Sequence, residues 1–329
     1  MKILITGVHG FVGSNLVAYL SKENEIYGLD IIAPEKTGVV KTYSWDDLDA
    51  GLVTEVDAII HLAGKAHDTK NQAAADVYFK VNRDLTIKIF DYFCAHPDIK
   101  KFVFFSTAKA AADKVEGVLT EDVVPSPLGP YGESKIAAEQ YIQEKFKEFN
   151  GSKDQANSQL STSNSQRQAK SVYIFRPCMI HGPGNKGNLN LLYNVVRKGI
   201  PWPLGAFENR RTFTSVENIC FAVNGVLTKD VESGIYNMGD DVALSTNELI
   251  EEICKSLGKK AHIWRLPKGL MNGVAKIGGA LHLPLDPERL RKLTESYVSS
   301  NAKIKRALGV EKMPVDARVG LKVTLESFK

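Results

Sequence analysis

Residues 2–13 of the chain read KILITGVHGFVG. The apolar run at Lys2–Thr6 predicts a buried strand, and Gly7, Gly10 and Gly13 follow it in a G-x-x-G-x-x-G pattern. Apolar residues at helical spacing then predict a helix over 12–21. The glycines permit a tight turn, and the helix N-terminus presents N–H groups and a positive dipole end. The stretch therefore predicts a strand, turn and helix that bind a pyrophosphate.

An acidic residue near the end of the next strand indicates which dinucleotide binds. The run Glu25–Ile31 predicts this strand, and Asp30 lies near its end. A carboxylate there accepts hydrogen bonds from ribose hydroxyls and repels a 2′-phosphate, which favours NAD over NADP. The alternative is a glycine-rich turn beside an ordinary aspartate at a strand end. The correct order of strand, glycines, helix and acid favours the nucleotide site.

Strands and helices alternate through the first half of the chain. Further strands are predicted at Ala58–Ala63, Lys101–Ser106 and Ser171–Phe175, and further helices at 74–95 and 132–148. Such alternation predicts βαβ units in a parallel sheet. The stretch 32–42 contains Pro34 and Gly38 and is too short for a crossover helix, so a loop is expected there. We expect an α/β fold with a doubly wound parallel sheet of the Rossmann type.

The second half predicts a smaller domain. The pattern becomes less regular after Arg176, with a strand expected at Gly234–Gly239. We expect an NAD-binding domain over 1–175 and a mixed α/β substrate-binding domain over 176–329, some segments of which return to the first domain. Residues 151–170 are rich in Ser, Gln and Asn, and we interpret them as a flexible surface insertion rather than a binding segment.

The composition excludes several classes of protein. The chain has 329 residues, and its 43% hydrophobic and 24% charged residues are typical of a globular protein. The net charge of +4 is too small to indicate a nucleic-acid or membrane-surface partner. No apolar run is long enough to insert across a bilayer. Because the first residues already predict a strand, no cleavable leader is expected.

The cysteines indicate neither a metal site nor a disulfide framework. The chain contains Cys94, Cys178, Cys220 and Cys254, which are far apart in sequence and form no C-x-x-C pair. This spacing disfavours a zinc site and suits a reducing cytosol. We therefore expect a cytoplasmic protein without a metal.

Tyr131 and Lys135 form a candidate proton-transfer pair. Their i, i+4 spacing places both side chains on one face of the helix predicted at 132–148. A phenol has a pKa near ~10, but a neighbouring ammonium and a bound nicotinamide cation both favour the phenolate. Such a pair suits the interconversion of an alcohol and a ketone. Because Y-x-x-x-K is frequent by chance, an exposed helix face is the alternative.

A hydroxyl-bearing pair ends the strand predicted at Lys101–Ser106. Ser106 and Thr107 lie at the edge of the sheet where open α/β folds bind ligands. Thr107 would donate or accept a hydrogen bond at the reacting oxygen. The alternative is an ordinary turn at the strand end.

Together these motifs resemble the extended short-chain dehydrogenase/reductase family, which includes the nucleotide-sugar epimerases and dehydratases. The matching elements extend from Gly7 to about Gly239. They include Asp30, His61-Leu62-Ala63-Gly64, Ser106-Thr107, Tyr131-x-x-x-Lys135, Arg176-Pro177, Gly182-Pro183 and Arg211-Thr212-Phe213.

A narrower resemblance is to a bacterial branch that serves surface-polysaccharide synthesis. Its members are described as UDP-hexose 4-epimerases and as reductases that make UDP-N-acetylquinovosamine from a 4-keto precursor. The matching residues are His61-Leu62-Ala63-Gly64-Lys65-Ala66-His67, Ser106-Thr107-Ala108-Lys109, Gly187-Asn188-Leu189 and Glu208-Asn209-Arg210-Arg211.

The resemblance implies a role for each matched residue. Thr107, Tyr131 and Lys135 would form the catalytic triad, and Lys135 would also hold the nicotinamide ribose. Arg211 would pair with the UDP diphosphate, a role that suits a guanidinium; the alternative is that Arg210 and Arg211 are a solvated basic pair. Thr107, Asn188 and Arg211 would bind the substrate. The implied NAD-binding residues are Gly7, Gly10, Phe11, Val12, Gly13, Asp30, Ile31, Leu62, Ala63, Gly64, Ser106, Tyr131, Lys135 and Pro177.

Departures from the family pattern narrow the reaction. The 4,6-dehydratases of this family carry an Asp-Glu pair directly after the active-site threonine, whereas this chain has Ala108 and Lys109. Dehydration therefore lacks its acid and base, and decarboxylation is also disfavoured. Met179 replaces an asparagine common in the epimerases. Lys109 either reaches a substrate carboxylate or phosphate or is a surface lysine.

Three functions remain open from the sequence. The first is a UDP-sugar 4-epimerase, in which Tyr131 removes the C4 hydroxyl proton and the NAD is recycled. The second is an NAD(P)H-dependent 4-ketoreductase of a UDP-4-keto-6-deoxy-N-acetylhexosamine, which needs the same residues. The third is a dinucleotide-sensing regulator, which the Tyr131 and Lys135 pair disfavours.

The expected partner is a second copy of the chain. Family members commonly dimerise through two long helices of the first domain, so the helices predicted at 74–95 and 132–148 are candidates for a homodimer interface.

Overall fold

The computed structural model describes residues 1–66, 74–157, 169–280 and 285–329, without the side chains of 151–157 and 280. A seven-stranded parallel sheet forms its centre, in the order β10-β7-β5-β4-β1-β2-β3. The strands are β1 (Lys2–Thr6), β2 (Glu25–Leu29), β3 (Lys41–Tyr43), β4 (Ala58–His61), β5 (Lys101–Phe105), β7 (Ser171–Pro177) and β10 (Gly234–Met238). The predicted doubly wound α/β fold is therefore confirmed.

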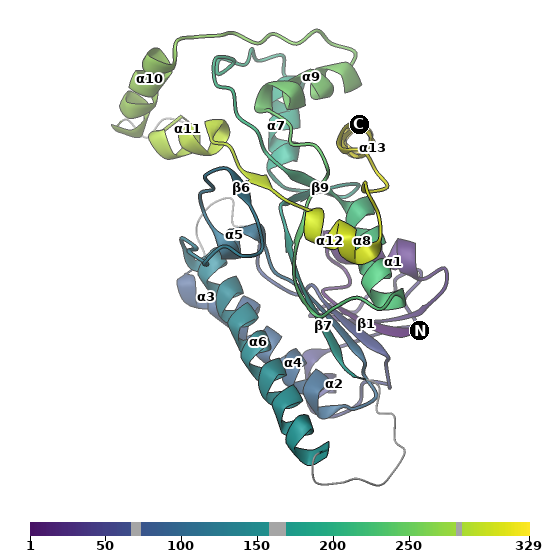
Figure 1. Ribbon diagram of the computed structural model, residues 1–329. Helices are drawn as coiled ribbons and strands as arrows, with labels where there is room; N and C mark the ends of the chain where they lie inside the picture. Colours follow the sequence, from purple (N-terminus) through teal and green to yellow (C-terminus); the bar gives the residue numbers. More distant parts are fainter. Residues whose placement is uncertain (67–73, 158–168, 281–284) are drawn as a thin grey trace.

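Helices cover both faces of this sheet (Figure 1). One face carries α1 (Phe11–Leu20) and α8 (Val216–Thr228), which contact each other. The other carries α4 (Leu85–Ala95) and α6 (Pro130–Asn157), together with α3 (Ala75–Phe79) and a π-helical turn η1 (Lys80–Asp84). The helix predicted over 74–95 thus contains a π turn that the apolar pattern does not reveal.

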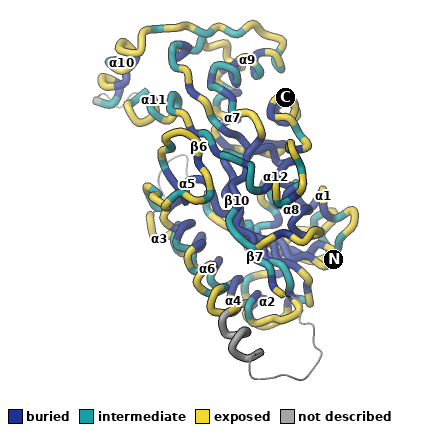
Figure 2. The backbone as a smooth tube through the Cα atoms, in the orientation of Figure 1, coloured by how far each residue is buried: buried dark blue, intermediate teal, exposed yellow. Residues whose placement is uncertain are grey.

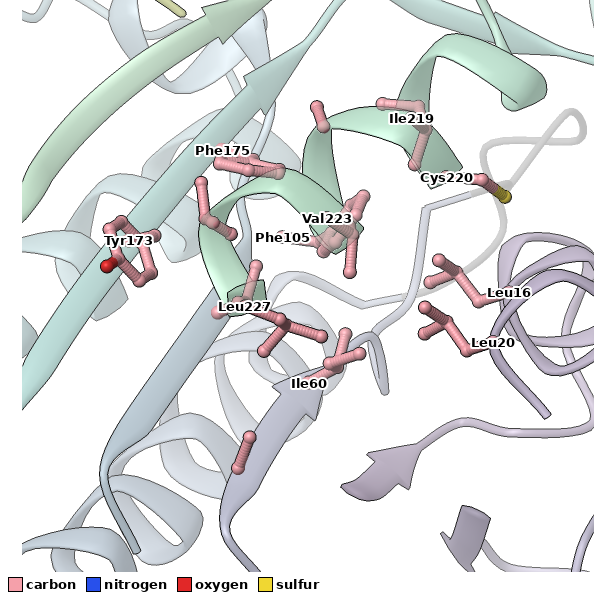
Figure 3. Close-up of a cluster of buried hydrophobic side chains, with 14 of the residues drawn as sticks. Leu16, Leu20, Ile60, Phe105, Tyr173, Phe175, Ile219, Cys220, Val223 and Leu227 are labelled. Carbon is pink, nitrogen blue, oxygen red and sulfur yellow. The ribbon is translucent and has the colours of Figure 1, made fainter. Parts of the chain in front are cut away.

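Alternate residues of each strand enter opposite cores, as expected for a sheet buried on both faces. Ile3 and Ile5 of β1 pack in the core that contains α1 and α8, whereas Leu4 packs in the core that contains α4 and α6. Figure 3 shows the first core, in which Leu16 and Leu20 of α1 lie near residues of α8. The apolar runs therefore bury both faces of the sheet.

The connection between β2 and β3 is a loop, as predicted. Hydrogen bonds join Asp30 N–H to the Tyr43 carbonyl and Val40 N–H to the Ile26 carbonyl. A short helix that was not predicted, α2 (Trp45–Asp49), follows β3 and begins with a capping box of Ser44 and Asp47.

The segment predicted as a flexible insertion begins within a helix. Helix α6 continues to Asn157, so the backbone of 151–157 is helical, and the flexibility of the segment stays a prediction. Lys170 is not a surface residue: its buried ammonium donates to the carbonyls of Phe93, His96 and Ile99 at 2.6–2.7 Å. Residues 158–168 lie outside the described residues.

The second half of the chain lies over the carboxyl ends of the central strands (Figures 1 and 2). It adds the strand pair of β8 (Met179–His181) with β9 (Phe213–Ser215). Its strand β11 (Val298–Ser299) pairs with β6 (Val118–Leu119) of the first half. The division at 175 stays a prediction. The helices outside the central layers are α5 (Ala108–Ala111), α7 (Asn188–Arg197), α9 (Thr246–Ser256), α10 (Lys268–Ala280), α11 (Pro287–Thr294), α12 (Ala302–Leu308) and α13 (Ala317–Glu326).

Within the described ranges, every helix is too short or too polar to cross a membrane.

Candidate active site

A cavity of about 360 Å³ opens where the carboxyl ends of the central strands meet the second half of the chain. This is the position at which open α/β sheets bind ligands. Most of the residues predicted for catalysis, cofactor and substrate line it: Phe11, Val12, Leu62, Gly64, Ser106, Thr107, Tyr131, Lys135, Pro177, Asn188 and Arg211. The sheet therefore gathers residues that are far apart in sequence.

The glycine loop lies beside this cavity, between β1 and α1. Gly7 has a φ of +69°, which favours glycine, and a Cβ there would lie 3.0 Å from the backbone nitrogen of Ala63. A Cβ on Gly13 would lie 2.4 Å from the carbonyl oxygen of Gly7. Gly10 precedes α1 as its N-cap. Its N–H closes the turn by donating to the carbonyl oxygen of Gly7 at 3.0 Å. The loop and helix are thus packed too closely for larger side chains.

The N-terminus of α1 is suited to an anion. Among the described residues no side chain caps it, and its first turn contains no acidic residue. The first N–H groups of a helix have no partner within the helix and carry the positive end of its dipole. The residues present therefore fit a pyrophosphate at this position.

Asp30 follows β2 and the glycine loop follows β1, so both lie at the carboxyl-terminal edge of these two parallel strands. Its carboxylate accepts the N–H of His9 at 3.0 Å and that of Ile31 at 2.8 Å. The Ile31 side chain is 85% exposed. This arrangement holds an acceptor next to the loop, as a ribose-binding carboxylate requires.

Thr107, Tyr131 and Lys135 are brought together by β5 and α6. Thr107 lies just beyond β5, and its hydroxyl and the phenol of Tyr131 both line the cavity. Burial raises the pKa of Tyr131 above the ordinary value, against the smaller opposite effect of the Thr107 hydroxyl. Lys135 is buried and donates to the carbonyl of Phe105 at 2.8 Å. Burial lowers the pKa of Lys135 to about 8, against the opposite effect of Glu139.

A buried carboxylate that the sequence analysis missed connects this group to β7. Glu139 lies one turn after Lys135 and is fully buried. It accepts a hydrogen bond from Ser106 and pairs with Arg176, whose Nη2 lies 2.6 Å from its Oε2. The network fixes α6 against the ends of β5 and β7. Its sequence signal is the i, i+4 relation of Lys135 and Glu139.

Asn82 was also missed, and it lies in the π turn η1. Its amide oxygen accepts the N–H of Lys65 at 2.7 Å, and its amide nitrogen donates to Ser134 at 3.0 Å. It therefore connects the Leu62–Lys65 loop to α6 beside Lys135. A π turn at a functional site is a recurrent feature of helices.

The two arginines predicted at 210 and 211 lie in different surroundings. Arg211 lines the cavity, donates to the carbonyl of Lys292 at 2.6 Å, and has its pKa lowered by burial. Arg210 is exposed and pairs with Glu248 at 2.9 Å. Only Arg211 is thus available to a ligand in the cavity. Asn188, the exposed first residue of α7, also lines the cavity.

The residues that depart from the family pattern also line the cavity. Ala108, Lys109 and Met179 are among its walls. Lys109 pairs with Asp113 at 2.8 Å and lies 5.1 Å from the ring centre of Tyr297, a further wall residue that the sequence analysis missed. Lys109 is therefore neither fully exposed nor free of an internal partner.

Curated relatives are similar over nearly the whole chain. A UDP-glucose 4-epimerase of Vibrio cholerae is 28% identical over 353 residues, which cover 99% of this chain and 95% of the relative. An Escherichia coli O157:H7 protein named N-acetyl-alpha-D-glucosaminyl-diphospho-ditrans,octacis-undecaprenol 4-epimerase is 26% identical, over 93% of this chain and 85% of its own.

Solved structures share the fold. The UDP-glucuronic acid 4-epimerase of Bacillus cereus in complex with NAD has a TM-score of 0.72 and covers 100% of this chain and 98% of its own, at 20% identity. MoeE5 in complex with UDP-glucose and NAD gives the same TM-score and identity. At this identity the likeness concerns the fold alone.

The family model described as "NAD dependent epimerase/dehydratase family" matches residues 3–239, which is well over half of the chain. The match includes the glycine loop, Asp30, Thr107, Tyr131 and Lys135. It confirms the predicted resemblance, the prediction of an enzyme and the prediction of NAD as cofactor. The chain belongs to the NAD-dependent epimerase/dehydratase family.

Proposed function

We propose that this enzyme is a UDP-hexose 4-epimerase that acts on UDP-glucose or UDP-N-acetylglucosamine. The observation that carries the proposal is that Thr107, Tyr131 and Lys135 line one cavity, with Lys135 one helical turn after Tyr131. Ala108 and Lys109 replace the acid pair that dehydration needs. The names of the Vibrio cholerae and Escherichia coli relatives support a 4-epimerase.

Tyr131 is the proposed acid and base. As a phenolate it accepts the proton of the sugar C4 hydroxyl, while the Thr107 hydroxyl holds the same oxygen by a hydrogen bond. The ammonium of Lys135 stabilises the phenolate by its charge. The chemistry that NAD would supply when bound is the uptake of a hydride from C4 of the sugar and the return of that hydride to C4. The 4-keto sugar turns in the site, so that the hydride returns to its opposite face and the configuration at C4 is inverted. Tyr131 gives the proton back to the C4 oxygen.

The proposed cofactor contacts follow from the chain's own groups. The N–H groups at the start of α1 hold the pyrophosphate and Asp30 holds the adenosine ribose. Gly7, Gly10 and Gly13 leave space for this approach. The other predicted residues, Phe11, Val12, Ile31, Leu62, Ala63, Gly64, Ser106 and Pro177, enclose the rest of the dinucleotide.

Arg211 and Asn188 are proposed to bind the substrate. The Arg211 guanidinium offers two parallel donors to a diphosphate oxygen pair. The product would be a nucleotide-sugar precursor of a surface polysaccharide in the cytoplasm. We also propose that the enzyme is a homodimer that buries α4 and α6, which light scattering of the purified protein tests directly.

The test of the epimerase uses purified protein with UDP-glucose or UDP-N-acetylglucosamine and no added cofactor. Proton NMR of the anomeric region should show a galacto-configured product, because the NAD is recycled within the enzyme. The absence of conversion, even with added NAD, would refute the proposal for these sugars. Oxidation of NADH by a UDP-4-keto-6-deoxy-N-acetylhexosamine would then assign the 4-ketoreductase reaction.

A further inference from the structure

One stretch of the chain concentrates positive charge. Residues 253–285 contain six lysine and arginine residues and no aspartate or glutamate. Since the whole chain carries +4, the remaining residues carry −2. The modest net charge therefore hides a strongly basic segment, which the total alone does not reveal.

The described part of this basic segment before residue 281 forms one extremity of the molecule. It leaves the end of α9, extends along the outside of the second half, and enters α10 (Figure 1). Much of its course is exposed (Figure 2), including Lys259, Lys260, Arg265 and Lys268. In the part of the chain that the structure describes, none of these four side chains has a carboxylate within salt-bridge distance. Lys259 donates to the Arg197 carbonyl at 2.7 Å, and the Lys268 ammonium lies 5.7 Å from the ring centre of Phe207. These contacts do not neutralise their charge, and Lys260 and Arg265 are exposed beside them.

Large apolar side chains are exposed on the same segment. Leu270, Val274 and Ile277 of α10 are 54%, 44% and 60% exposed, and their i, i+4, i+7 spacing places them on one face of the helix. Trp264, in the extended part, is 54% exposed. These four residues and the exposed cations of the same segment, Lys259, Lys260, Arg265, Lys268 and Lys276, are called the α10 surface below.

The helix does not need this apolar face for its own packing. Met271 and Ala275 are buried in a cluster with Leu204 and Leu290, and α10 contacts α11. The inner face therefore anchors the helix, and within the described residues the outer face remains exposed.

We propose that the α10 surface docks onto an anionic lipid bilayer. An apolar helix face surrounded by lysine and arginine lies in the interface plane of membranes, and anionic lipids attract each such cation. Tryptophan is enriched at that interface. Protein–protein interfaces, in contrast, are depleted in lysine, so a protein partner fits these residues less well. The docking is peripheral and involves no membrane-spanning segment.

The test is co-sedimentation of the full-length protein with vesicles. We expect it to sediment with phosphatidylcholine vesicles that contain phosphatidylglycerol, to sediment little with pure phosphatidylcholine, and to be released by high salt. Val274→Ser with Ile277→Ser should weaken binding by at least about fivefold. Lys260→Gln with Lys276→Gln should weaken it on the order of twentyfold, at about fivefold per charge.

Two control variants match these changes elsewhere on the surface. Val319→Ser with Val323→Ser removes an exposed i, i+4 apolar pair from α13, and Lys114→Gln with Lys312→Gln removes two exposed lysines. Both should bind vesicles as the wild type does. Equal losses in the controls, or wild-type binding by the α10 variants, would overturn the proposal.

A second copy of the chain is the competing occupant. No sedimentation with anionic vesicles, together with a lower mass of the Val274→Ser, Ile277→Ser variant in light scattering, would assign the face to self-association and overturn membrane docking. None of the substituted residues lines the active-site cavity. Conversion of soluble UDP-sugars should therefore be unchanged, which keeps this test separate from that of the proposed function.

Discussion

At the scale of single residues, the phenol of Tyr131 is the group on which the proposed chemistry depends. Tyr131→Phe should lower kcat by about 10²–10⁴-fold, the usual contribution of a general acid and base, with no loss of folded structure. The measurement is the rate of C4 inversion by NMR. Tyr141→Phe is the matched control, because Tyr141 lies on the same helix and donates to Asp91 at 2.6 Å outside the cavity. Retention of more than a tenth of the activity in Tyr131→Phe would remove it from catalysis.

Lys135 should set the alkaline limit of the reaction. Its pKa is lowered to about 8 by burial, so it is positive below that pH and neutral above it. Once the ammonium is lost, the phenolate of Tyr131 is no longer stabilised, and the buried phenol regains its raised pKa. We expect kcat/KM to fall as the pH rises above about 8, measured from initial rates across the range.

A charge-preserving variant separates this effect from others. Lys135→Arg keeps a positive charge at every accessible pH, so its lower activity should show no fall near pH 8. The same alkaline limb in both proteins would mean that another group titrates there.

The sequence predicts the reacting residues better than those that hold them in place. Tyr131, Lys135 and Thr107 stand in recognisable patterns at a helix start and a strand end. Glu139 does not, because a carboxylate in the middle of an amphipathic helix usually faces solvent. Only the pairing of β5 with β7 brings Ser106 and Arg176 to it. Asn82 was missed because its partners depend on a π turn.

At the scale of elements, the contact between the glycine loop and α1 leaves no room for a methyl group. A Cβ at Gly13 would lie 2.4 Å from the Gly7 carbonyl oxygen and 2.9 Å from Val8, and these are backbone atoms. Gly13→Ala should therefore lower the free energy of unfolding by about 1–3 kcal/mol, although alanine favours helices. Urea unfolding with and without NAD measures both stability and cofactor binding.

Gly273→Ala is the control for this prediction. Gly273 lies in α10, and apart from its chain neighbours and the surrounding helix backbone, no atom of the described residues lies within 4 Å of its added Cβ. Here alanine should leave stability unchanged or raise it by up to about 1 kcal/mol. Equal effects at the two positions would show that close packing does not explain the requirement at Gly13.

Strands and long helices were predicted because their apolar patterns are strong. Lys2–Thr6 agrees with β1 in full, and Ala58–Ala63 and Lys101–Ser106 extend β4 and β5 by one or two residues. The five-residue helix α2 is too short to show a period. The continuation of α6 to Asn157 was missed because its composition is polar, yet a helix that has already formed extends with little cost per residue.

At the scale of the whole molecule, the two halves of the sequence share one core. Strand β10 pairs with β7, and Ile219, Val223 and Val226 of α8 lie in the same cluster as Leu16 and Leu20 of α1. Periodicity within either half cannot reveal this, since it describes only local segments. The domain prediction addresses this shared core only by expecting that some segments of the second half return to the first domain.

A fragment ending at residue 175 should therefore not fold alone. It lacks β10 beside β7 and exposes the apolar face that α8 covers in the whole chain. Exposed apolar surface of this kind leads to aggregation or a loosely packed state. We expect no cooperative thermal transition for 1–175 by far-UV circular dichroism, and more native-like helical signal for 1–239, which restores α8 and β10.

The full-length chain should then unfold as one unit. Trp45 lies in the first half, and Trp202 and Trp264 lie in the second, so a variant that keeps only Trp45 and one that keeps only Trp202 report on each half by fluorescence. Because the shared core couples the halves, both probes and circular dichroism should give the same urea midpoint. Two separate midpoints, or a cooperative transition in the 1–175 fragment, would show that the first 175 residues form an autonomous domain.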